Sequence, residues 1–187
     1  MRCNVADNGV ILAFYGDSGY RDDGSNGQVM VYQPKFYYRR IPITTNNLKI
    51  GKAIKTESIV ISATPKTGFK LHPLFIDNEG NELEYVLLSA YEGCTFDKSA
   101  NQYNLNDNGL VDFDNDMLSS IAGAKPISGY NTTLTIENAE KLATNRGEGW
   151  HITNMAAESA NQMLEIIEFG LMNGQEALEK GICNITS

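Results

Sequence analysis

Residues 153–171 read TNMAAESANQMLEIIEFGL, and apolar side chains recur in them at helical spacing. The members of this stripe are Ala156, Ala160, Met163, Leu164, Ile167 and Leu171. They fall at intervals of three and four residues, which places them on one face of a helix, while Thr153 is a suitable N-cap. The stretch therefore predicts a helix that packs one face on a core.

Two further helices are expected on either side of it. Thr135 can cap a helix over residues 136–145, and a short helix is expected from Asn173 to Gly181. Trp150, the single tryptophan, lies in an extended bridge between the first two helices and is expected to fill a core position.

The chain before residue 130 has the pattern of short strands joined by turns. The expected strands are 10–15, 28–32, 58–62, 75–76 and 83–88, followed by a long exposed excursion over 98–109. Strands first and helices after predict an α+β fold. We expect a β-rich N-terminal extension over residues 1–50 and a second domain over 51–187.

Charge and hydropathy exclude several classes of function. The 187 residues carry a net charge of −8, and such a field repels phosphate backbones, so we expect no nucleic-acid partner. No apolar run approaches the length of a membrane helix, and the N-terminus has no apolar signal core, so we expect neither membrane insertion nor export through an N-terminal signal. No GxGxxG or GK[ST] motif is present, and no cofactor is expected.

The residue types that usually carry catalysis are present without a supporting pattern. Cys3, Cys94 and Cys183 are too far apart in sequence for a zinc knuckle or a CxxC motif, and we interpret them as buried or half-buried thiols. His72 precedes a proline among apolar neighbours and is expected to bond to backbone near the start of a strand. His151 lacks a second histidine at metal-ligand spacing. We therefore assign no catalytic, cofactor or metal residue, and we expect that the protein is not an enzyme.

Two clusters leave alternatives open. Asp112, Asp114 and Asp116 alternate as calcium ligands do, but a calcium loop of the EF-hand type needs Gly and Glu where Met117 and Gly123 stand. The run is interpreted as a solvated acidic turn, with a non-standard ion site as the alternative. Residues 36–38 (Phe-Tyr-Tyr) are expected to pack in the core or on a sheet face, with a ligand platform as the alternative.

Several segments resemble, in order, a group of phage and prophage tail-fibre or virion-surface proteins. They are 27–31 (GQVMV), 34–38 (PKFYY), 68–76 (GFKLHPLFI), 90–93 (AYEG), 149–151 (GWH), 159–164 (SANQML), 167–170 (IEFG), 173–175 (NGQ) and 181–182 (GI). The C-terminal half of these proteins has a C-type-lectin-like fold, in which two main helices pack on small antiparallel sheets. The fold is distantly similar to the major tropism determinant of phages with diversity-generating retroelements, and to formylglycine-generating enzymes.

The resemblance implies a tail-fibre-like module of the virion surface, assembled in the cytoplasm of a bacterial host. It would attach to a host cell-surface glycan or protein through a preformed surface and without catalysis. The alternatives are a structural virion protein of the baseplate, neck or head that binds other phage proteins, and a variable display protein of a diversity-generating retroelement. A homotrimer is expected from the way tail fibres are usually built.

Two departures from that family limit the transfer of site residues. Family members continue past the Gly181-Ile182 motif with a Gly- and Asn-rich segment that carries the exposed binding surface, so we expect either a fragment or a shorter version. No ligand-binding residue is carried over for this reason. The two-cysteine site of formylglycine-generating enzymes also has no counterpart, because the surroundings of Cys94 and Cys183 do not match its motif.

Overall fold

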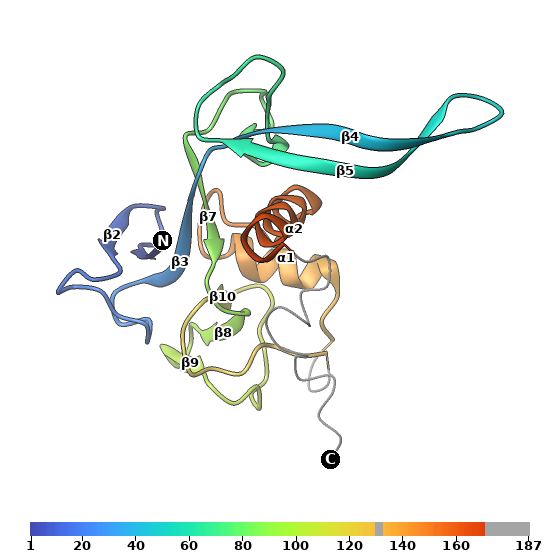
Figure 1. Cartoon of the computed structure of the whole chain (residues 1–187). Helices are drawn as coiled ribbons and strands as arrows, with labels where there is room; N and C mark the ends of the chain where they lie inside the picture. Colours follow the sequence, from blue (N-terminus) through green and yellow to red (C-terminus); the bar gives the residue numbers. More distant parts are fainter. Residues whose placement is uncertain (130–132, 171–187) are drawn as a thin grey trace. The chain divides into compact units, whose positions relative to one another are not determined.

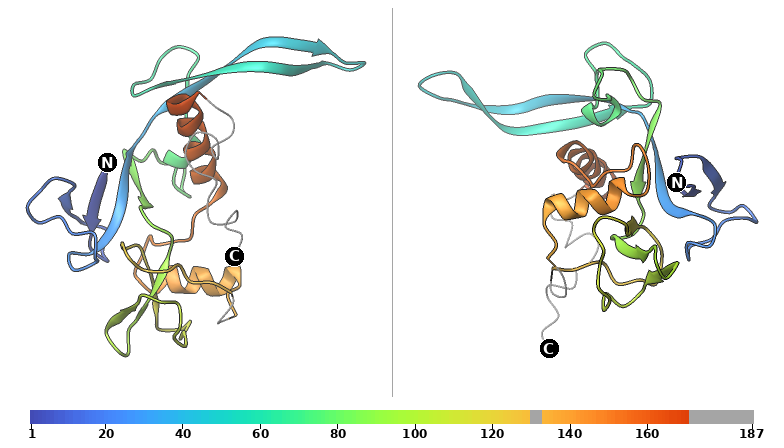
Figure 2. Two further views of the ribbon diagram at one scale, coloured as in Figure 1. Left: turned by 60° about the horizontal axis from the view of Figure 1, so that its bottom comes forward. Right: turned by 180° about the vertical axis from the view of Figure 1, so that it is seen from behind.

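The computed structural model describes residues 1–129 and 133–170 and has an α+β architecture (Figures 1 and 2). Two helices and three small antiparallel sheets make up these residues, which confirms the α+β prediction. The chain divides into two compact units: unit 1 contains residues 1–33 and 87–153, and unit 2 contains 34–86 and the described residues from 154 onward. The predicted domain boundary after residue 50 lies in the turn of a hairpin of unit 2.

The first sheet has the strand order β2–β1–β3–β7 and begins with the N-terminal residues. Its strands are β1 (Arg2–Val5), β2 (Ile11–Phe14), β3 (Gln28–Pro34) and β7 (Tyr85–Ser89). The buried side chains of Cys3, Val5 and Met30 form a core against which Trp150 and other partly buried residues pack. The predicted strands at 10–15, 28–32 and 83–88 are confirmed within a few residues. Trp150, expected to fill a core position, packs against this core but is only partly buried.

The second sheet of unit 1 has the order β10–β8–β9. It contains β8 (Cys94–Asp97), β9 (Gln102–Asn104) and β10 (Met117–Ser119), and α1 (Ile136–Thr144) packs against β10. The predicted exposed excursion over 98–109 is wrong at its centre, because β9 pairs with β8 and half-buries Tyr103. The predicted cap of α1 is confirmed: the Thr135 hydroxyl accepts a hydrogen bond from the Asn138 amide at 3.2 Å.

Unit 2 combines a long hairpin with a helix. Strands β4 (Tyr37–Asn47) and β5 (Lys52–Ser62) pair along their whole length, and β6 (Lys70–Leu71) joins the base of β4. Helix α2 (Met155–Phe169) contributes Ala160 and Met163 to a core with Phe36 and Phe75. Phe36 and Tyr37 are buried and Tyr38 packs on the same core, so the prediction that this aromatic run packs inside is confirmed.

Three details of unit 2 differ from the sequence prediction. The segment before β7 is not a strand at 75–76 but a 3₁₀ helix, η1 (Pro73–Phe75), because Pro73 fits the first helical position and His72 caps it. The N-cap of α2 is Asn154 instead of Thr153, and its side chain accepts from the Ala157 amide at 3.0 Å. Ile167, expected on the buried face, is 40% exposed, while Ala157 is buried. The predicted helix from Asn173 and the predicted stripe residue Leu171 lie outside the described residues.

Candidate functional site

The acidic run of unit 1 is held in a tight turn by hydrogen bonds to Asp112. Asp112 accepts hydrogen bonds from the Asp114 amide at 3.0 Å and from the Asn115 side-chain amide at 2.8 Å. These two donors, with the Asn115 amide first, hold the pKa of the Asp112 carboxyl below its ordinary value. Asp112 therefore stays ionised at neutral pH and acts as the acceptor at the centre of the turn.

Asp116 connects this turn to the end of strand β8. Its carboxylate accepts from the Lys98 amide at 3.1 Å and from the Asp112 amide at 2.9 Å, and the residue is only 4% exposed. Sequence reasoning treated Asp116 as part of a solvated turn, and that interpretation is wrong for this residue. Its partner at residue 98 is distant in sequence, so the pattern of the acidic run does not reveal it.

The alternative that these carboxylates hold an ion gains no support from the geometry. Asp114 forms an exposed ion pair with Lys141 at 2.9 Å, whereas Asp116 binds backbone amides. Within residues 1–129 and 133–170, no group of three His, Cys, Asp or Glu side chains is placed to hold a metal.

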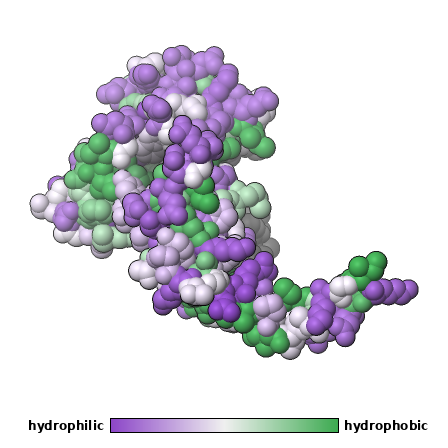
Figure 3. Space-filling model, turned by 90° about the horizontal axis from the view of Figure 1, so that it is seen from above, coloured by the Kyte–Doolittle hydropathy of each residue, from purple (hydrophilic) through white to green (hydrophobic). Residues whose placement is uncertain are grey.

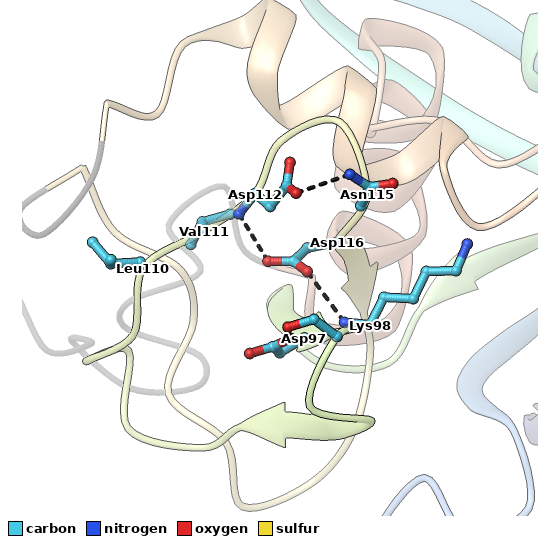
Figure 4. Close-up of a pocket in the computed structure, with 8 residues that line it drawn as sticks. Asp97, Lys98, Leu110, Val111, Asp112, Asn115 and Asp116 are labelled. Atoms are coloured by element: carbon cyan, nitrogen blue, oxygen red, sulfur yellow. Dashed lines mark hydrogen bonds between the residues drawn. The ribbon is translucent and has the colours of Figure 1, made fainter.

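A hollow of about 580 Å³ lies beside this turn (Figure 4). Its lining comes from two segments joined through Asp116, and consists of Asp97, Lys98, Ser99, Leu110, Val111, Asp112, Asn115 and Asp116. The side chain of Leu110 is almost wholly exposed, at 96%. The lining thus combines carboxylates, an amide and a hydroxyl with two aliphatic side chains.

Asp97 and Lys98, at the end of β8, line one side of the hollow. One oxygen of Asp97 accepts from the Ala100 amide at 2.8 Å and from the Ser99 hydroxyl at 2.7 Å. The same two donors, the Ala100 amide first, keep the pKa of Asp97 below its ordinary value. The Lys98 ammonium forms no described ion pair, and its side chain extends away from the carboxylates in Figure 4. The ionised carboxylate of Asp97 has the capacity to accept further hydrogen bonds from a polar ligand.

The described cysteines are not placed as nucleophiles. Cys3 and Cys94 are buried, and burial raises the pKa of the Cys94 thiol to about 11. Such a thiol is protonated at neutral pH, whereas the thiolate is the nucleophile. The prediction of buried thiols is confirmed for these two residues, and Cys183 lies outside the described part of the chain.

The two histidines have structural partners. His72 is 2% exposed, its Nδ1 accepts from the Leu74 amide at 3.3 Å, and burial lowers its pKa below the ordinary value of 6.5. The predicted bond to backbone is therefore confirmed. His151 is exposed and lies 2.7 Å from a carboxylate oxygen of Glu140, whose other oxygen accepts from the Ile152 amide. This arrangement ties α1 to the chain that follows Trp150.

Sequence reasoning missed two features. Arg146 was expected only as the end of a helix, yet its guanidinium is buried and donates to the Leu118 carbonyl at 2.8 Å and to Asp7 at 2.6 Å. The second feature is the outer part of the β4–β5 hairpin, where residues 39–52 are all exposed. A cluster of lysines at 49, 52 and 55 in an acidic chain was the available signal.

No helix in the described residues is long and apolar enough to cross a membrane. Comparisons of the chain with protein-family models, with curated proteins and with solved structures found no match.

Proposed function

We propose that this protein is a non-catalytic binding module of a phage virion surface, with a C-type-lectin-like fold, that attaches to a glycan on the host cell. The observation that carries the proposal is the hollow between residues 97–99 and 110–116, whose shape is held by two backbone amides bonded to the buried Asp116. A surface already in its binding geometry loses little conformational entropy when a ligand arrives.

The side chains of the hollow suit a polyhydroxylated ligand. A carboxylate oxygen of Asp97 and the side-chain oxygen of Asn115 can accept hydrogen bonds from sugar hydroxyls. Leu110 and Val111 offer apolar contact for the C–H face of a sugar ring. A few placed polar groups beside apolar surface are typical of sites for small ligands.

Two further arguments support the lectin-like fold and the non-catalytic role at a virion surface. Two helices and small antiparallel sheets are compatible with a lectin-like frame, and the ordered series of family-like segments spans residues 27–182. Two of the groups that could act in catalysis have structural roles: the Cys94 thiol is buried and protonated, and His72 is bonded to the Leu74 amide. Binding through a surface is the function that these observations favour.

The test is binding of the purified chain to a glycan array and to intact host cells. We expect binding that Leu110→Ala weakens about 10-fold, because the change removes apolar contact from the hollow. The Leu110 side chain is 96% exposed, so it does not support the fold. Val10→Ala is the matched control, since Val10 is an exposed aliphatic residue of unit 1 away from the hollow. Absence of binding to both glycans and cells would overturn the proposal.

The alternative of a structural virion protein is favoured by the exposed β4–β5 hairpin, which offers a surface for another protein. A protein of that kind should bind neither the array nor the cells and should bind virion proteins instead.

A further inference from the structure

The outer part of the β4–β5 hairpin, from Arg39 to Glu57, forms an arm with an exposed apolar surface. In the ribbon views it extends beyond the other elements of unit 2 (Figures 1 and 2). Five large aliphatic side chains of the arm are exposed: Ile41, Ile43, Leu48, Ile50 and Ile54. Ile50 is 93% and Ile43 is 66% exposed, and Figure 3 shows hydrophobic side chains along the arm. Exposed aliphatic side chains gathered on one hairpin are typical of an interaction surface.

The arm is also open along both of its edges. In the sheet order β5–β4–β6, strand β5 lies at the edge, and β6 reaches β4 only at Tyr37 and Tyr38. From Arg39 onward the described residues therefore give the arm no third strand. A two-stranded hairpin is marginally stable by itself in water, so packing against another surface would stabilise it.

The charge of the arm indicates what kind of surface would pack against it. The arm holds five basic residues, Arg39, Arg40, Lys49, Lys52 and Lys55, and one acidic residue, Glu57, for a net charge of +4. Because the whole chain carries −8, the residues outside the arm carry −12. A basic arm and an acidic remainder attract each other when they belong to different copies.

We propose that the arm docks on the acidic remainder of a second copy of this chain. Direct pairing of two arms is disfavoured, because it would bring Lys52 and Lys55 of the edge strand close to the same residues of the other arm. Pro42 and the register shifts around Thr44 also disrupt a continuous ladder. The contact is therefore made by side chains, with the isoleucines buried and the lysines at the rim.

An arm that binds a different surface of its partner makes a heterologous contact. Contacts of this type build closed rings or open chains, since every copy both donates an arm and accepts one. The inference stands independently of glycan attachment, because it uses none of the residues of the hollow.

The first test is the oligomeric state of the full chain, measured by sedimentation and native mass spectrometry. We expect self-association at micromolar concentrations in 50 mM salt, weakened in 1 M salt. The triple variant Ile43→Thr, Ile50→Thr and Ile54→Thr keeps residues suited to strands and should weaken association on the order of 100-fold. A wild-type chain that remains monomeric would overturn the proposal, and so would self-association that the triple variant leaves unchanged.

The second test distinguishes docking on the body from pairing between arms. The ¹⁵N-labelled triple variant, monomeric by itself, still carries the acidic remainder unchanged, so it should form mixed dimers with the wild type. If the wild type self-associates but forms no mixed dimers with the variant, the interface lies between two arms, and the proposal is contradicted. Binding of monomers to phosphatidylglycerol vesicles without self-association would also contradict it, because the arm would then serve a lipid surface.

Discussion

Replacing Asp116 by Asn tests whether this buried carboxylate holds the shape of the hollow. The two side chains have nearly the same size, so the change removes charge and one acceptor without opening a cavity. Asp116 accepts from the Lys98 amide at 3.1 Å and the Asp112 amide at 2.9 Å. In the variant one of these amides faces an NH₂ group and loses its acceptor.

The expected cost follows from these two bonds. A hydrogen bond to a charged group contributes about 1.5–3 kcal/mol, and a buried donor left without a partner costs about 1–3 kcal/mol. With one bond lost and the other weakened by the loss of charge, we expect the free energy of unfolding to fall by about 2–3 kcal/mol. At a typical urea dependence of about 2 kcal/mol per molar, the midpoint falls by roughly 1–1.5 M.

Urea unfolding followed by tryptophan fluorescence measures this effect, because Trp150, the single tryptophan, packs on the core of unit 1. Asp114→Asn is the matched control in the same turn: its ion pair with Lys141 is exposed to solvent, so its loss should change the urea midpoint little. Hydrogen exchange should speed up at the amides of Lys98 and Asp112. If Asp116→Asn lowers the midpoint no more than the control does, Asp116 does not hold the hollow.

Two further predictions concern the cores of the units. Gly27→Ala should lower the free energy of unfolding by about 2–4 kcal/mol in urea, because Gly27 has φ +89° and an added Cβ would lie 2.5 Å from the Val5 carbonyl oxygen. Gly9→Ala, with φ +82° and open space, should cost about 1 kcal/mol, and equal losses would contradict the steric argument. Burial lowers the pKa of His72 in the folded state, so its stabilising effect is complete above pH 6.5 and decreases as the pH falls below it. His72→Asn keeps an acceptor for the Leu74 amide, and urea midpoints at pH 7.5 and 5.5 should differ less in this variant than in the wild type.

Local signals in the sequence were sufficient for the helices. The 3.6-residue spacing of apolar side chains and a capping residue predicted α1 and α2 within two residues. Adjacent Thr153 and Asn154 are both good caps, and nothing local distinguishes them. The prediction of a strand at 75–76 was wrong because the apolar run suggested extended backbone. Pro73 and the His72 cap favour a 3₁₀ turn there instead.

Contacts between distant residues could not be predicted in the same way. The alternating carboxylates at 112, 114 and 116 look alike in sequence, but only Asp116 meets an amide 18 residues away and becomes buried. The helix-ending Arg146 likewise gave no sign that it would bond to Asp7, which is 139 residues away. In both cases, the partner that decides the role of the side chain is brought close only by the fold.

The sequence analysis did not predict the arm, because the pattern used to recognise a strand arises only when one of its faces is buried. A strand with one face in a core alternates apolar and polar residues, whereas both faces of the arm are exposed and its isoleucines stand among lysines and threonines. In a monomer such a sequence would be an aggregation hazard, because five aliphatic side chains are exposed on a hairpin with open edges. The same composition is appropriate if a second copy covers the isoleucines, because the surrounding positive charge then limits docking to an acidic surface.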